Sequence, residues 1–315
     1  MSDFVVETRN ADYRVLADHR AQLLRLTAAA LLVGASYYLG AKVGFALTFQ
    51  PHPVSTLWPP NSIVLAALLL SSTRSWWLLL LAVFPAHLLV QLNAHIPTTM
   101  VLCWYVSNCS EALISASLFR YLTGGAPVRF DNTHHVSLFT LVALTGPFLS
   151  SFLDAAFVML NHFGTATYWD VFRMRFFSNV LASFVLVPLI VSWSRVDFAS
   201  LRNAPWQRYL EAAFLAAGLV IVGLVSFRAG VTGAETRSAL IYLPLPLLLW
   251  ATIRFGPNGS SAALLAVSFF EIWAATHDLG PFTGRTPELN ALAVQLFLSL
   301  AYLPLLFLAA LIKER

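Results

Sequence analysis

Ten apolar stretches run through this chain of 315 residues, and its Lys and Arg residues gather in every second connection between them. Since bilayer hydrocarbon is about 30 Å thick, a helix that crosses it needs about 20 mostly apolar residues, and fewer where neighbouring helices shelter its ends. The candidate spans are residues 23–49, 58–73, 75–93, 98–120, 136–160, 171–193, 208–227, 238–253, 259–276 and 289–312. This pattern predicts a protein that crosses the membrane ten times.

The composition excludes an ordinary soluble domain, because 58% of the residues are hydrophobic and only 11% are charged. The apolar stretches lack the alternation of barrel strands, and backbone groups in lipid must bond internally. We therefore expect an all-α fold, a polytopic membrane helical bundle. Its net charge of +4 is attributed to anchoring at the membrane surface, so the lipid bilayer is an expected partner and nucleic acid is not.

Orientation follows from the loops, because cytoplasmic connections retain Lys and Arg. Placing the N-terminus inside puts thirteen of the nineteen Lys and Arg residues on the cytoplasmic side. Both termini are then cytoplasmic. We divide the chain into a juxtamembrane segment (1–22), a membrane domain (23–312) and residues 313–315, which either begin a cytoplasmic signalling helix or end an excised module.

Ionisable side chains at bilayer depth are costly, so they normally face the protein interior and have partners. Six of them fall in one depth band of the outer half at a rise of about 1.5 Å per residue: Lys42, His87, Asp154, Arg173, Arg175 and Glu271. We expect a hydrated cavity open to the outside, in which Asp154 pairs with Arg173 or Arg175, and Glu271 with Lys42. An alternative of equal weight is that such pairs only join helices, while Lys42 and the arginines extend to the headgroups.

Deeper in the predicted bundle, Asn108 and Glu111 are three residues apart and share a helix face. A carboxylate near the middle of the bilayer must be protonated or paired, which makes Glu111 the first candidate for ligand binding or signalling. The structural alternative is a hydrogen bond between helices through Asn108 and Asn179. Trp58 is expected at the outer boundary, where Trp is enriched.

Catalytic motifs are missing. The sequence has no phosphate-binding loop, no GxSxG elbow, no dinucleotide fingerprint, no Asp-rich metal motif and no paired histidine ligand spacing. We therefore predict no enzyme activity, no cofactor and no metal.

Three motifs resemble the first family of bacterial membrane-associated sensor domains (MASE1): Trp58-Pro59-Pro60, Asn108-x-x-Glu111-Ala112 and Arg254-Phe255-Gly256-Pro257. The resemblance covers most of the chain, although Asn179 stands where the family has an acidic residue. It implies a sensory input domain in the bacterial inner (plasma) membrane. Such domains pass a signal to a cytoplasmic histidine kinase or to an enzyme of cyclic-di-GMP signalling.

We therefore expect a two-component or cyclic-di-GMP sensor that detects an unknown small molecule or membrane protein at its outer half. The last helix would carry the signal to an output domain, fused or separate, and pair with a second copy in a homodimer. A transporter or permease is the rival, because ten spans and Glu111 would also serve it. A structural subunit that binds another membrane protein is a third alternative.

Overall fold

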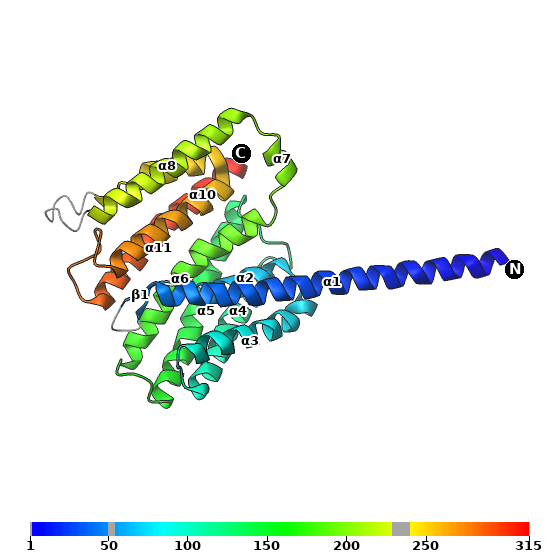
Figure 1. Cartoon of the computed structure of the whole chain (residues 1–315), viewed down its shortest axis with the longest axis horizontal. Coiled ribbons are helices and arrows are strands. Elements are labelled where there is room, and N and C mark those ends of the chain that lie inside the picture. The colour runs from blue at the N-terminus through cyan, green and yellow to red at the C-terminus, as the bar shows by residue number, and fades with distance from the viewer. Residues whose placement is uncertain (1, 50–53, 229–239, 315) are drawn as a thin grey trace.

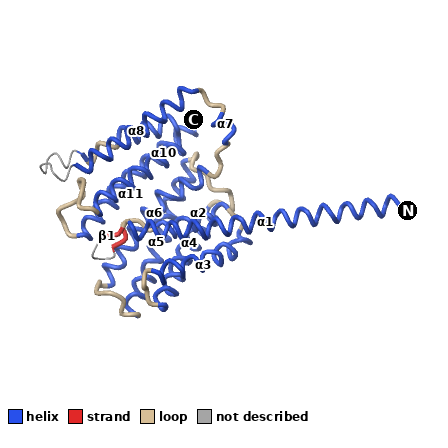
Figure 2. The backbone as a smooth tube through the Cα atoms, in the orientation of Figure 1, coloured by secondary structure: helices blue, strands red, loops and turns tan. Residues whose placement is uncertain are grey.

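The protein is described by a computed structural model that covers residues 2–49, 54–228 and 240–314. The described part is almost entirely helical (Figures 1 and 2), so the expected all-α class is confirmed. The long helices are α1 (Ser2–Ala46), α2 (Pro59–Leu70), α3 (Trp76–Asn93), α4 (Thr98–Leu122), α5 (Thr133–Leu160), α6 (Tyr168–Trp193), α8 (Trp206–Arg228), α10 (Leu245–Thr276) and α11 (Pro287–Glu314). The short elements are β1 (Thr48–Phe49), β2 (Val54–Ser55), η1 (Thr73–Ser75) and α7 (Phe198–Arg202).

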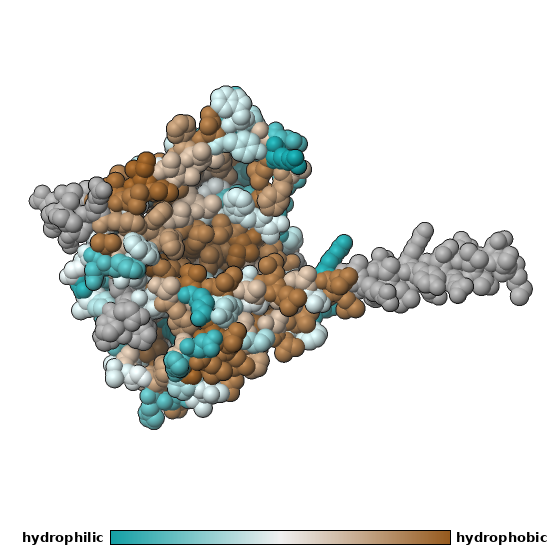
Figure 3. Space-filling model, viewed as in Figure 1, coloured by the Kyte–Doolittle hydropathy of each residue, from teal (hydrophilic) through white to brown (hydrophobic). Residues whose placement is uncertain are grey.

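Seven helices of the described part are long and apolar enough to cross a membrane: α1 from Leu23 onward, η1 with α3, α5, α6, α8, α10 and α11. Helix α2 is apolar but only 12 residues long. Helix α4 is long, but its interior carries Asn108 and Glu111. Apolar residues cover much of the face drawn in Figure 3. By length and hydropathy, therefore, seven of these helices qualify as spans, fewer than the ten expected.

Helix α10 consists of two arms joined at Gly256, which has a φ of 60° and a ψ of −150°. The hydroxyl of Thr252 lies 3.0 Å from that of Ser260, to which it donates. In a straight helix, residues eight apart are separated by about 12 Å along the axis. The chain therefore reverses here, and the expected break between residues 238–253 and 259–276 is present.

The central helix of the bundle is α6. It packs against α2, α5, α10 and α11, whereas α8 packs against α10 at the periphery. Accordingly, 61% of the most apolar window of α6 is buried, compared with 22% for α8. Helices α1, α2 and α3 pack together beside α4, and α4, α5 and α6 follow one another (Figure 1). Side chains on α6 are therefore placed to contact several other helices.

Local sequence fixes where three of these helices begin. Pro59 and Pro60 open α2, where their missing N–H groups would have had no helical partner. The Asn132 side chain caps α5 by accepting from the His135 N–H at 3.0 Å. Thr167 and Asp170 form a capping box at the start of α6. These helix starts fix the positions, along each helix axis, of the polar side chains that follow.

Candidate site: a buried polar cluster between α2, α4, α5 and α6

Polar residues form a stripe along each of three neighbouring helices. In α4 they are Trp104, Ser107, Asn108 and Glu111, in α5 Ser150, Ser151 and Asp154, and in α6 Arg175, Ser178 and Asn179. Spacings of three and four residues place each set on one helix face. The three faces meet, and Trp58, directly before α2, and Asn61 of α2 complete what we call the polar cluster.

An ion pair lies at one end of the polar cluster. The Arg175 Nε atom is 2.6 Å from an Asp154 carboxylate oxygen, and the two side chains are only 19% and 5% exposed. The guanidinium also stands 4.8 Å from the ring centre of Trp104 and 6.0 Å from that of Trp58. Two aromatic rings and one carboxylate thus replace water around this charge. The expected pairing of Asp154 is present, with Arg175 as the partner.

Glu111 joins three helices. One carboxylate oxygen, Oε2, accepts a hydrogen bond from Ser150 Oγ at 2.8 Å and another from Asn179 Nδ2 at 2.6 Å. Asn61 of α2 lies beside the same carboxylate. The structural alternative for Glu111, a hydrogen bond between helices, is therefore found at Asn179, whereas sequence reasoning did not identify Ser150 or Asn61.

Asn108 bonds away from Glu111, into a chain of hydrogen bonds towards α1 and α3. Its Nδ2 donates to the Tyr37 hydroxyl at 3.1 Å, and Tyr37 in turn lies 2.8 Å from His87 Nδ1. His87 Nε2 is 2.9 Å from the Val101 carbonyl. Because a carbonyl only accepts, Nε2 carries a proton and donates a hydrogen bond to Val101. His87 thus links α1, α3 and α4.

The expected pair between Lys42 and Glu271 is wrong. Lys42 is exposed, and its ammonium lies 5.7 Å from the ring centre of Tyr38 on the same helix. Gly40 and Gly44 explain this, since they form the face of α1 that touches Pro59 and Trp58. Two residues from either glycine, Lys42 is about 200° round the helix and points outward.

Glu271 is buried in a different place, at only 2% exposure. Ser226 of α8 lies beside its carboxylate, but one carboxylate oxygen has no hydrogen-bond partner among the described residues. No ion pair of the described part includes Glu271.

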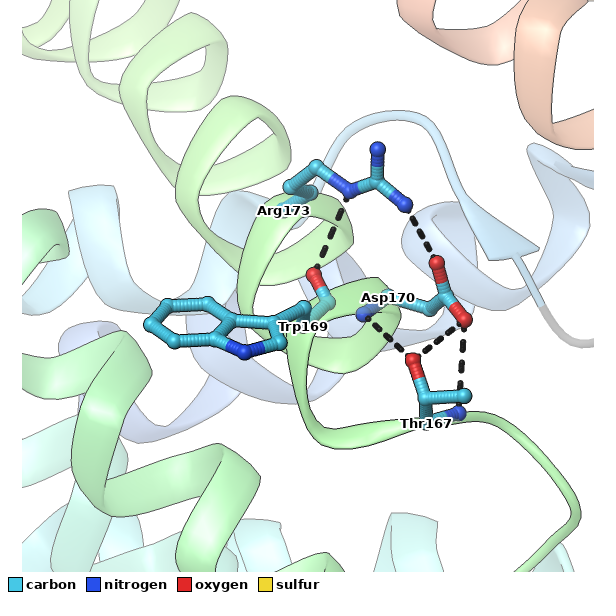
Figure 4. Close-up of polar contacts among 4 residues, drawn as sticks. All are labelled: Thr167, Trp169, Asp170 and Arg173. Carbon is cyan, nitrogen blue, oxygen red and sulfur yellow. Dashed lines mark hydrogen bonds and ion pairs between the residues drawn. The ribbon is translucent and has the colours of Figure 1, made fainter.

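Arg173 also lies outside the polar cluster, and its contacts are with Trp169 and Asp170 on its own helix (Figure 4). Its guanidinium pairs with Asp170, one turn earlier, and its Nε donates to the Trp169 carbonyl at 3.3 Å. The Arg173 side chain is 60% exposed. Arg173 and Arg175 are two residues apart and therefore face opposite sides of α6.

Seven of the ten candidate residues are thus connected through the polar cluster and its hydrogen-bonded chain, namely Trp58, His87, Asn108, Glu111, Asp154, Arg175 and Asn179. The three others, Lys42, Arg173 and Glu271, are not. Sequence reasoning missed Tyr37, Asn61, Trp104 and Ser150. The helical stripe that contains Asn108 and Glu111 also contains Trp104 at the same spacing, and that signal was available in the sequence.

Several buried polar atoms of the polar cluster have no hydrogen-bond partner within the described part of the chain. They are Trp58 Nε1, Asn61 Nδ2 and Oδ1, Trp104 Nε1, Ser151 Oγ, Asp154 Oδ1, Ser178 Oγ and Asn179 Oδ1. Buried polar groups are normally paired, so such a concentration requires an explanation. The polar cluster therefore contains buried donors and acceptors that the described residues leave unpaired.

The fold and the polar cluster define a helical membrane protein with a buried charged centre. A comparison with protein families matches residues 29–315 to MASE1. This chain belongs to that family of membrane-associated sensor domains, which confirms the resemblance carried by the three motifs. Neither a curated protein nor a solved structure matches the chain. It is accordingly a multi-pass membrane sensory domain, of a family that is not catalytic in itself.

Proposed function

We propose that this domain detects a small polar ligand, or a polar group of a membrane partner, at the polar cluster. The observation that carries the proposal is the concentration of unpartnered buried donors and acceptors around the ion pair of Arg175 and Asp154. A ligand with both donors and acceptors would satisfy groups that are expensive to leave unpaired. Its binding would draw α2, α4, α5 and α6 together.

Helix α11 is the proposed route to the output. Glu314, in its last turn, accepts hydrogen bonds from the Thr133 amide at 3.2 Å and the Thr133 hydroxyl at 2.8 Å. Asn132 adds a third, at 3.3 Å. These contacts tie the end of α11 to the start of α5, the helix that carries Ser150 and Asp154. A shift of α5 on ligand binding would therefore move α11 and a cytoplasmic histidine kinase or cyclic-di-GMP enzyme, fused or separate.

We further propose ten crossings with both termini in the cytoplasm of a bacterium, in its inner membrane. The seven apolar spans become ten when α2, α4 and the second arm of α10 are counted. The short α2 is acceptable because neighbouring helices cover it, with nine of its residues buried. An even number of crossings puts the end of α11 on the same side as the start of α1.

A homodimer is proposed through α11. Its most exposed apolar side chains include Leu289, Leu296, Leu300 and Leu311. Their spacings of seven, four and eleven residues keep them on one face, as in helices that pair over a long distance. That arrangement supports pairing with a second copy.

The test is a fusion of the full chain to a diguanylate cyclase whose product is measured over a panel of growth conditions. Arg175→Gln should hold the output at one level, while the matched control Arg173→Gln should keep the wild-type range. Membrane abundance of the three proteins must be equal. If Arg175→Gln responds like wild type, the polar cluster is not the sensory site.

The transporter alternative is tested separately in proteoliposomes. A sensor is expected to show no net flux of labelled amino acids, sugars or inorganic ions above that of empty vesicles. Flux that Arg175→Gln abolishes would contradict the sensory proposal and favour transport.

A further inference from the structure

A pocket lies at the opposite end of α4 from the ion pair of Arg175 and Asp154. It has a volume of about 480 Å³ and is bounded by α1, the turn between α2 and α3, and the end of α4. Arg120, one of its lining residues, is nine residues beyond Glu111, which corresponds to about 14 Å of helix. The pocket is therefore separate from the polar cluster, and nothing argued for the cluster bears on it.

The polar side of this pocket is positively charged. Arg74 and Arg120 line it together with the hydroxyls of Ser72, Thr73 and Ser75, and its lining residues include no carboxylate. Neither arginine belongs to an ion pair of the described part. Guanidinium groups and hydroxyls are the groups that bind phosphate oxygens. This pocket has two of the former and three of the latter, with no acidic side chain among them.

Arg120 is held in place by groups that leave its charge available. Its Nη2 donates to the Ser71 and Leu68 carbonyls at the end of α2, and its guanidinium lies 5.2 Å from the Trp76 ring centre. A guanidinium has five N–H donors, and those of Arg120 Nη1 and Nε have no hydrogen-bond partner among the residues that the structure describes. Arg74 is exposed and can complete the binding of an anion from the other side.

The other wall of the pocket is apolar and is formed by Leu26, Trp77 and Leu78. Leu26 lies near the start of the apolar part of α1 (Leu23–Ala46), and the apolar span that contains α3 begins at Thr73. The pocket therefore lies where two apolar spans begin, which is the depth of lipid headgroups. Trp77, which is 66% exposed, is of the residue type enriched at that depth.

We propose that this pocket binds the phosphate group of an anionic phospholipid. Arg74 and Arg120 bind the phosphate oxygens, Thr73 and one member of the hydrogen-bonded pair Ser72 and Ser75 donate to the headgroup, and the acyl chains lie along Leu26, Trp77 and Leu78. A soluble phosphate ester shares the phosphate chemistry, but the apolar wall favours the lipid. A lipid held here would contact α1 and α4 at once and fix their spacing at the membrane surface.

The experiment uses the full chain, purified in detergent and titrated with phosphatidylglycerol, phosphatidylcholine or inorganic phosphate while bound species are counted by native mass spectrometry. We expect one retained phosphatidylglycerol and about fivefold weaker retention in Arg74→Gln, the effect of removing one cation near a membrane surface. The matched control is Arg202→Gln, which removes an exposed arginine of α7, in the connection after α6. It should retain the lipid as wild type does.

The remaining outcomes are equally decisive. In one of them, inorganic phosphate binds as tightly as the lipid and loses its binding in Arg74→Gln. That result would support a phosphate site and would assign its ligand to a soluble ester. Phosphatidylcholine retained as well as phosphatidylglycerol would overturn the proposal, as would equal losses in the two variants. If Arg74→Gln unfolds at the same temperature as the wild-type protein, misfolding is excluded. We expect this result because Arg74 forms no ion pair in the described part of the chain.

Discussion

Two Arg–Asp pairs, both with their arginine on α6, show how strongly the surroundings of a charge decide its role. Arg173 and Asp170 are 60% and 41% exposed, and their attraction competes with solvent. Arg175 and Asp154 are 19% and 5% exposed and lie against Trp58 and Trp104. The second pair has lost most of its water, so each member depends on the other.

The first prediction concerns these two pairs. Asp154→Asn should destabilise the protein by about 3–5 kcal/mol, because it leaves a buried guanidinium without its partner. Asp170→Asn, the matched control, keeps an oxygen that can accept from Thr167 in the capping box and should cost less than about 1 kcal/mol. Both values are measured by denaturant unfolding of the purified protein in mixed micelles.

The charge swap Asp154→Arg with Arg175→Asp should recover part of the loss. Recovery is partial because the exchanged guanidinium no longer lies over the two Trp rings. If the double variant is no more stable than either single variant, Asp154 and Arg175 do not act as a pair.

The second prediction concerns Glu111. Glu111→Gln keeps the size of the side chain and an oxygen that can accept from Ser150 and Asn179, but it removes the possibility of a negative charge. We expect normal membrane abundance and loss of the response of the fused cyclase. Glu288→Gln, which changes an exposed acid in α11, is the control and should respond normally. A full response from Glu111→Gln would remove this residue from the mechanism.

At the level of elements, the reversal within α10 depends on one residue. Gly256 has a φ of 60° and a ψ of −150°, a backbone conformation that is costly for any residue with a side chain. The arms on either side then meet closely, since a Cβ on Gly259 would collide with Phe255. The motif Arg254-Phe255-Gly256-Pro257 is thus a turn between two helices.

The third prediction follows from that turn. Gly256→Ala should destabilise the protein by about 1–3 kcal/mol through backbone strain alone, because no atom would contact the added Cβ. Gly218→Ala is the control, since Gly218 is helical and its Cβ would meet only the flexible tip of Leu247. Equal unfolding midpoints for the two variants would contradict this account of Gly256.

The fourth prediction concerns the contact between α11 and α5. Glu314→Gln removes the charged acceptor for Thr133 and Asn132, so α11 should no longer follow α5. We expect the fused cyclase to lose most of its response while the stability measured for the membrane domain is unchanged. Lys313→Gln, which alters the exposed neighbour, should keep the response. A normal response from Glu314→Gln would direct the search for the output route elsewhere.

At the level of the whole molecule, the number of crossings depends on how α10 is counted. If its two arms each cross the membrane, the turn at Gly256 is cytoplasmic and the end of α11 lies on the side of the N-terminus. If α10 crosses once, the two ends of the bundle lie on opposite sides.

The fifth prediction uses this difference. Green fluorescent protein fused after residue 315 should fluoresce, and alkaline phosphatase inserted between Gly280 and Thr286 should be active, because the former folds inside the cell and the latter outside. A phosphatase inserted after Gly256 should be inactive. An active phosphatase at Gly256 would contradict ten crossings.

The sequence alone determined the class of fold and the family. Apolar runs of span length and the distribution of Lys and Arg depend on the thickness and charge of a bilayer, and both can be read locally. The turn at Gly256 could also be recognised from local sequence, since Arg254-Phe255-Gly256-Pro257 separates two apolar runs. The spacing of side chains along a helix axis is also set by the sequence, because the rise per residue is constant.

Only the tertiary structure decided which charges at one depth meet. Depth does not fix rotation, and a change of two residues turns a side chain about 200° round a helix. Lys42 and Arg173 therefore point outward, whereas Arg175 points inward, because packing of Gly40 and Gly44 against α2 and the central place of α6 set those rotations. The contacts of Tyr37 with His87 and Asn108 join three helices and depend on how those helices pack.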